Sequence, residues 1–277
     1  IRQKYADSIF NGYARAAAEQ PPLYHTLKNF ETIYASDHYL GTKPPGILIP
    51  YVATEKLASL LSPSATAEER FFKLTRLAAY TYPFIAFLVL PVLAYFSRSL
   101  VKEPADSILP AVVYILLPNV ILIPLFLDQV LYPLLFMLIL AGALRSLDQP
   151  SFIAGFFIGA GAYIALYFSF SLLALLPLIG MWVVLEWLRR REPGLFRQSI
   201  RFGAGVLAGI LLSLAVFRVG LNYDIFTRYT NAFSNHSTTW HFANRQEQIR
   251  HALVLNNAEF VTFSGFPIAL LVLIRLG

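Results

Sequence analysis

From Phe152 to Leu185 the chain carries no charged residue. As a single α-helix this stretch would be about 50 Å long, because each residue adds about 1.5 Å. The hydrocarbon core of a bilayer is only about 30 Å thick. The stretch therefore predicts two membrane-spanning helices, with a tight break between them near Tyr167–Ser171.

Five further stretches are apolar and free of charge: residues 77–96, 108–127, 129–144, 202–217 and 260–274. Only 14% of the 277 residues are charged, whereas soluble domains average about 25%. The pattern predicts an all-α, polytopic membrane protein with about seven spans. It excludes a soluble enzyme, a disordered chain and a nucleic-acid-binding domain, and much of the net charge of +6 lies in one short arginine cluster.

The connections between the predicted spans differ in charge. Alternate connections carry basic residues, namely Arg98, Lys102, Arg145, Arg189, Arg190, Arg191, Arg197 and Arg201. Such connections face the cytoplasm in membrane proteins. Residues 1–76, the turn at Asp128 and the loop 221–257 are then extracytoplasmic. We therefore divide the chain into an outer-face segment, 1–76, and a transmembrane domain, 77–277, which includes the outer loop.

The chain begins at Ile1 and stops directly after an apolar stretch. We interpret it as a piece of a longer protein, with at least one element before Ile1. Cysteine is absent, so neither a disulfide framework nor a thiolate metal site is expected.

Residues 46–61 predict an amphipathic helix that lies in the membrane interface. The segment is apolar but too short to span, and Ala53, Leu57, Leu60 and Leu61 fall on one face at helical spacing. Directly after it, Thr66 and Glu69 form a capping box, which predicts a helix that runs into the first span.

Two glycine pairs recur at the spacing that favours close helix packing in membranes. They are Gly155 with Gly159, and Gly205 with Gly209. We therefore expect the helices that carry them to pack closely.

The most distinctive outer segment reads Ser-Asp-His-Tyr-Leu-Gly-Thr-Lys-Pro-Pro-Gly and ends at Gly46. The two prolines after Lys43 favour a stiff, extended backbone. A lysine on such a support suits a fixed cation for an anionic group. Asp37 and His38 could bind a metal, shuttle a proton or pair with Lys43. The alternative is a solvated turn that introduces the interfacial helix.

Two further aspartates lie on the predicted outer face. Asp7 begins a helix-like stretch, where a carboxylate is also an ordinary N-cap. Asp128 is flanked on both sides by apolar helix, where a carboxylate is costly unless it is paired or functional. A plain cap at the interface is the alternative for Asp128.

The outer loop 221–257 is rich in basic and polar side chains: Arg228, Asn235, His236, His241, Arg245, Arg250 and His251. These residues could hold a phosphate or pyrophosphate group, or they could form a solvated loop. The histidines lack the tight spacing of a zinc site.

An early aspartate, then Lys-Pro-Pro, then an outer aspartate two spans later resembles the GT-C superfamily of membrane glycosyltransferases. The branch that it resembles contains protein O-mannosyltransferases and the lipid A aminoarabinose transferase. Asp7, Lys43-Pro44-Pro45 and Asp128 follow one another in that order, and the glycine-rich stretch from Ser151 is similar as well. Ser8 departs from the pattern, because family members carry a second acid there.

The resemblance implies inverting transfer of a sugar from a polyprenyl-phosphate donor on the extracytoplasmic face of the cell membrane. The acceptor would be a hydroxyl of a glycan, lipid or protein. Asp7 would be the general base, with Asp37 as the next candidate, and Asp128 would orient the acceptor or Lys43, or hold a metal. The donor phosphate would contact a basic set: Lys43, His38, Arg228 and Arg245. The sequence itself requires no cofactor, and a divalent cation remains open.

Two other functions stay open. A lipid or sugar transporter or flippase would explain the spans, but it predicts ionisable residues near the bilayer midplane. The predicted spans contain none. A scaffold subunit that keeps the fold without the activity would explain Ser8.

Overall fold

A computed structural model describes residues 12–19, 22–34, 37, 39–63, 66–98, 103, 107–116, 129–239, 250 and 254, apart from the side chains of 116, 193 and 236–239. The described part of the chain contains helices and turns and no strand. This agrees with the predicted all-α class.

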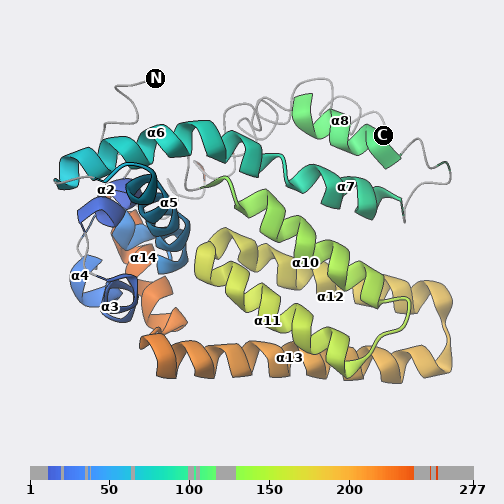
Figure 1. The fold of residues 1–277 in the computed structure, drawn as a ribbon. Coiled ribbons are helices and arrows are strands. Elements are labelled where there is room, and N and C mark those ends of the chain that lie inside the picture. Colours follow the sequence, from blue (N-terminus) through green and yellow to red (C-terminus); the bar gives the residue numbers. More distant parts are fainter. Residues whose placement is uncertain are drawn as a thin grey trace.

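One end of the molecule is a cluster of short helices (Figure 1). Its elements are α2 (Gly12–Glu19), α3 (Leu23–Lys28), α4 (Phe30–Tyr34), η1 (Leu40–Thr42), η2 (Pro45–Ile47), α5 (Leu48–Leu61) and α14 (Ile225–Thr239). The core shared by these elements, α14 excepted, contains the fully buried side chains of Tyr13, Leu48 and Tyr51. We call this group of elements the outer cluster, after its predicted side of the membrane.

A long helix leads from the outer cluster into the bundle. It comprises α6 (Ala67–Ala86) and α7 (Val89–Ser97), with a short turn between them. The Thr66 hydroxyl accepts a hydrogen bond from the Glu69 amide at 3.2 Å, so the predicted N-cap is confirmed. The first turns of α6 pack against α2 and α5, and its later part is apolar.

The remaining bundle helices form two successive hairpins: α10 (Tyr132–Ser146) with α11 (Phe152–Phe168), and α12 (Leu175–Arg190) with α13 (Pro193–Leu221). The helix α11 ends where Ser169 becomes extended, and η6 (Phe170–Ala174) leads into α12. The predicted break near 167–171 is therefore confirmed. A further short helix, α8 (Leu109–Leu116), lies beside α7.

The glycine pairs allow α11 and α13 to pack at close range. A Cβ atom on Gly155 or Gly159 would collide with the backbone of Phe202 or Val206 on α13. The reverse holds for Gly205 and Gly209, where a Cβ atom would meet the backbone of α11. The predicted close packing is confirmed, and the reason is that only glycine leaves room for two helix backbones at this separation.

Among the described residues, three helices are long and apolar enough to cross a membrane: Ala67–Ser97, Phe170–Arg190 and Gly194–Leu221. The apolar helices α10 and α11 are shorter, with 15 and 17 residues. The predicted span 108–127 is described only in its first part, and 260–274 lies outside the described residues. Leu207, Leu211 and Val216 on α13 are each more than half exposed, as lipid-facing side chains would be.

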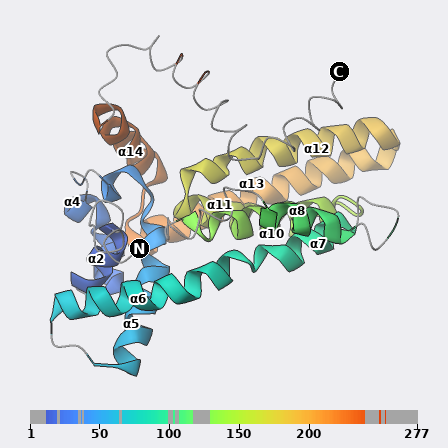
Figure 2. The same cartoon turned by 90° about the horizontal axis from the view of Figure 1, so that it is seen from above.

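The basic ends of α7, α10 and α12 and the outer cluster lie at opposite ends of the bundle (Figure 2). Arg98, Arg145, Arg189 and Arg190 end α7, α10 and α12 and line one cavity there, far from α2 and α14. The predicted separation of the two sets is therefore present in the fold. That the arginine end faces the cytoplasm remains a prediction.

Candidate functional site

The connection between α4 and α5 holds Lys43 on an extended backbone. Its start is fixed by Asp37, whose Oδ1 atom accepts hydrogen bonds from the amides of Tyr39 and Leu40, both at 2.7 Å. Lys43 has φ −132° and ψ 159°, and Pro44 has φ −68° and ψ 155°. The extended geometry that the prolines predict is therefore confirmed.

The Lys43 side chain is half-buried and lies against an aromatic ring. Its Nζ atom donates a hydrogen bond to the Tyr39 hydroxyl at 3.2 Å and lies 4.3 Å from the centroid of that ring. A cation over an aromatic face gains about 0.5–2 kcal/mol, depending on how far it is desolvated. These contacts hold the ammonium group at a defined position on the outer cluster.

Contacts between tyrosine side chains connect the segment that carries Lys43 to the neighbouring helices. The Tyr13 hydroxyl donates to the Pro44 carbonyl at 3.3 Å, and the Tyr13 ring stacks on Tyr51 with centroids 6.0 Å apart. Tyr51 in turn meets Tyr82 edge-on at 5.8 Å. Since these rings come from α2, α5 and α6, three helices fix the backbone that carries the lysine.

Gly46 brings the same segment against the transmembrane bundle. A Cβ atom at this position would collide with the backbone carbonyl and the ring of Tyr167, at the end of α11. Any side chain would therefore push the segment away from α11. The glycine after Lys-Pro-Pro thus has a packing reason that the sequence did not indicate.

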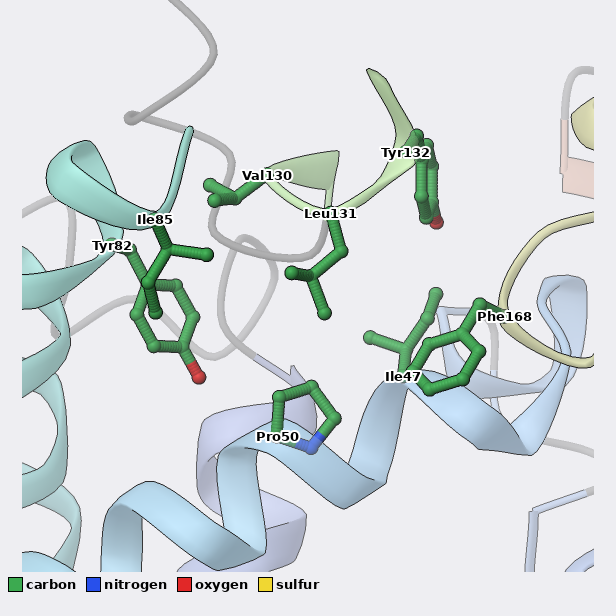
Figure 3. A pocket seen from close by; sticks show the side chains of 8 residues that line it. All are labelled: Ile47, Pro50, Tyr82, Ile85, Val130, Leu131, Tyr132 and Phe168. Carbon is green, nitrogen blue, oxygen red and sulfur yellow. The ribbon is translucent and has the colours of Figure 1, made fainter. Parts of the chain in front are cut away.

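A small apolar cavity lies behind the segment (Figure 3). It measures about 40 Å³ and is lined by side chains from four places in the chain: Ile47, Pro50, Tyr82, Ile85, Val130, Leu131, Tyr132 and Phe168. Leu131 points into the space between Tyr82 and Ile47. The lining is almost entirely apolar and the volume is small, so the cavity is not a sugar-binding pocket.

The helix α5 is present as predicted, and its apolar face points away from the protein. Leu57, Leu60 and Leu61 are 49%, 82% and 72% exposed. The buried face consists instead of Leu48, Tyr51, Val52 and Ala58. An exposed apolar face next to the bundle suits a helix in the membrane interface.

The helix α14 is fastened to the outer cluster by a buried arginine. Arg228 has no exposed surface, and its guanidinium bonds to the Glu31 carboxylate at 3.3 Å and to the Gly41 carbonyl. Asn231 donates to Glu31 at 2.9 Å, and Asn235 donates to Gly41 at 3.1 Å. Part of the predicted outer loop is therefore a helix that clamps the turn two residues before Lys43.

An acidic cap begins α14. Asp224 accepts hydrogen bonds from the amides of Phe226 at 2.9 Å and Thr227 at 3.3 Å, and it pairs with Arg218 at 3.1 Å. Burial by itself raises the pKa of the Asp224 carboxyl, but these amides and the Arg218 guanidinium outweigh it and hold that pKa below its ordinary value. The residue before it, Tyr223, is buried, and burial raises its pKa.

The structure describes three of the predicted site residues, Asp37, Lys43 and Arg228. All three act on the same short turn: Asp37 caps it, Arg228 bonds to Gly41 within it, and Lys43 follows it. The other predicted residues, Asp7, His38, Asp128 and Arg245, lie outside the described residues. Within the described part of the chain, no three His, Cys, Asp or Glu side chains form a group that could hold a metal ion.

Sequence reasoning missed Glu31, Tyr39 and Tyr13. Glu31 has no local signal, because its partner Arg228 is 197 positions away. Tyr39 stands four residues before Lys43, which is a detectable spacing, but the bend at η1 decides that its ring meets the ammonium group.

Comparisons of the chain with known protein families, with curated proteins and with solved structures find no match.

Proposed function

We propose that this chain is a multi-pass, GT-C-like membrane glycosyltransferase with about seven spans. It moves a sugar from a polyprenyl-phosphate donor to an acceptor hydroxyl on the extracytoplasmic face. The observation that carries the proposal is Lys43: its half-buried ammonium group lies on a proline-stiffened segment, at the end of an apolar helix bundle.

The transfer reaction explains why a fixed cation is needed beside the donor phosphate. The bond from the anomeric carbon to the phosphate oxygen breaks as the bond to the acceptor oxygen forms, so negative charge grows on the leaving phosphate. A preorganised cation stabilises that charge without reorganising during the reaction. Lys43 supplies the cation in this proposal, while Arg228, whose guanidinium is bonded to Glu31 and Gly41, positions the preceding turn.

The acceptor hydroxyl loses its proton to a carboxylate on the face opposite the leaving group, as in inverting glycosidases. Asp7 is the proposed base. Asp37 is the weaker candidate, because one of its carboxylate oxygens already accepts two backbone amides. Asp128 orients the acceptor in this proposal.

The exposed apolar face of α5 gives the donor lipid a route. The helix α5 follows Pro44 and η2, and its exposed leucines, Leu57, Leu60 and Leu61, lie about 14–20 Å further along the helix, where the polyprenyl chain would lie in the interface. The polyprenyl chain would then stay in the bilayer while its phosphate reaches the outer cluster.

The test uses membranes that contain the full chain, a radiolabelled polyprenyl-phosphate sugar and an acceptor extract. We expect Lys43→Ala to lower the transfer rate by about 10²–10³-fold, the range for loss of one preorganised charge-stabilising group. Lys43→Arg keeps the charge and should retain part of the rate.

Lys28→Ala is the matched control, because Lys28 also lies over a tyrosine ring, that of Tyr24 at 5.8 Å, but it is exposed. It should leave transfer unchanged. If Lys43→Ala transfers sugar at the wild-type rate, Lys43 is a turn residue only. If the labelled lipid crosses the membrane with its sugar bond intact, the chain is a flippase and the proposal is wrong.

A further inference from the structure

A charged cavity lies at the end of the bundle opposite to the outer cluster, between the ends of α7, α10 and α12. It measures about 350 Å³, and four arginines line it: Arg98, Arg145, Arg189 and Arg190. Apolar and aromatic side chains complete the wall, among them Phe96, Leu144 and Trp182. None of the lining residues belongs to the proposed transfer site.

The cavity has more positive than negative charge. Its lining includes two carboxylates, Asp148 and Glu186, against four arginines. Asp148 lies 3.4 Å from Arg145 and 3.6 Å from Arg190, and Glu186 pairs with Arg189 at 2.7 Å and with Arg190. Two acids are thus shared among three arginines.

Arg98 is the one arginine of these four that takes no part in the ion pairs with Asp148 and Glu186. Its guanidinium forms no ion pair with any residue that the structure describes, although it lines the same cavity. Because Arg98 is exposed, a ligand with negative charge can reach it together with the incompletely neutralised arginines beside it. Guanidinium groups match phosphate oxygens in geometry as well as in charge.

An apolar groove of about 460 Å³ continues from this cavity. The two share Tyr95, Ala141 and Arg145, and the groove runs between α7 and α10 to Val92 and Leu138. From Arg145 back to Leu138 is about 10 Å along the helix. A free phosphate would have no contact with such a groove, whereas a hydrocarbon chain would fill it.

We propose that this end of the bundle binds an anionic membrane lipid. Its phosphate contacts Arg98 and Arg145, and one of its chains lies in the groove between α7 and α10. Basic pockets between transmembrane helices hold acidic lipid head groups in this way, and the predicted cytoplasmic side of the cavity suits them. The site is separate from Lys43, so it stands whether or not the chain transfers sugars.

The test measures lipid binding to the purified full chain in a zwitterionic detergent. Phosphatidylglycerol is the probe, and phosphatidylcholine, glycerol 3-phosphate and inorganic phosphate are compared with it at equal concentration. We expect phosphatidylglycerol to remain bound in native mass spectrometry and to raise the melting temperature, and the other three to do neither.

Arg98→Gln with Arg145→Gln should weaken phosphatidylglycerol binding by at least about tenfold, since a hydrogen bond to a charged group contributes about 1.5–3 kcal/mol. Arg197→Gln with Arg201→Gln is the matched control, because both arginines are exposed at the same end and do not line the cavity. Val92→Trp fills the groove and should also weaken binding.

The proposal fails if the control pair weakens binding as much as Arg98 and Arg145, because general surface charge would then explain the result. It also fails if inorganic phosphate binds as tightly as the lipid and Val92→Trp has no effect, because the cavity would then take a free anion. Arg98 is exposed and forms no ion pair with the described residues, so Arg98→Gln alone tests the site with little expected change in stability.

Discussion

The arginines at the two ends of this protein differ in burial and in how completely acids pair with them. At the outer cluster Arg228 is fully buried, and bonds to Glu31 and Gly41 hold its guanidinium in place. At the other end the side chains of Arg145 and Arg189 are 70% and 72% exposed and share two acids with Arg190. A buried, paired charge builds a defined geometry, whereas exposed arginines with too few acids remain available to bind anions.

The largest effect should come from a labelling test of which end faces outward. The chain has no cysteine, so single cysteines can be introduced without background labelling. Thr230→Cys on α14 should react with an impermeant thiol reagent added to intact cells, and Gln198→Cys on α13 should react only after lysis. Both positions are exposed in the structure. The opposite pattern would reverse the orientation and remove the basis for an extracytoplasmic Lys43.

The next largest effect is expected at Arg228. Arg228→Met should lower the free energy of unfolding by about 3 kcal/mol, because Glu31 loses its buried partner. Thermal unfolding in detergent would measure the change. Arg218→Met, at an exposed ion pair, should cost less than about 1 kcal/mol. If the two variants are equally stable, α14 is not fastened to the outer cluster by Arg228.

A smaller effect should follow from a substitution that forces apart α11 and α13, the two helices that connect the two ends of the protein. Gly159→Leu should destabilise the protein by about 1–3 kcal/mol, as overpacking does, because its side chain meets the backbone of α13. Gly203→Leu offers the control, since nothing lies within 4 Å of a Cβ atom there. Melting temperatures of the two variants should differ, and equal values would exclude close contact of α11 and α13.

The smallest effect should be a pH dependence at the start of α14. The pKa of Asp224 is lower in the folded protein than its ordinary value, so its stabilising effect is complete above about pH 4 and is lost as the pH falls further. Asp224→Asn keeps an N-cap without a titratable group. It should therefore flatten the acid side of the stability curve by about 0.3–1 kcal/mol, the range for a negative charge at a helix N-terminus. An unchanged curve would mean that other carboxyls set the acid limit.

The candidate site could be predicted from the sequence only where the physics is local. Proline restricts its own φ and the residue before it, so the extended backbone at Lys43 follows from three consecutive residues. The bend at η1 brings the Tyr39 ring beneath the ammonium group, and the stack of Tyr13 on Tyr51 depends on how α2 and α5 meet. No spacing in the sequence encodes that meeting.

By itself, the sequence determined the apolar helices, the break at Ser169, the cap at Thr66 and the separation of basic from non-basic connections. Each of these features depends on hydropathy, capping or helix length, which act over a few neighbouring residues. Only the tertiary structure decided that α14 bonds to Glu31, that the apolar face of α5 points outward, and that four arginines from three helices surround one cavity. These features join residues that are distant along the chain, so they exist only once the helices have packed.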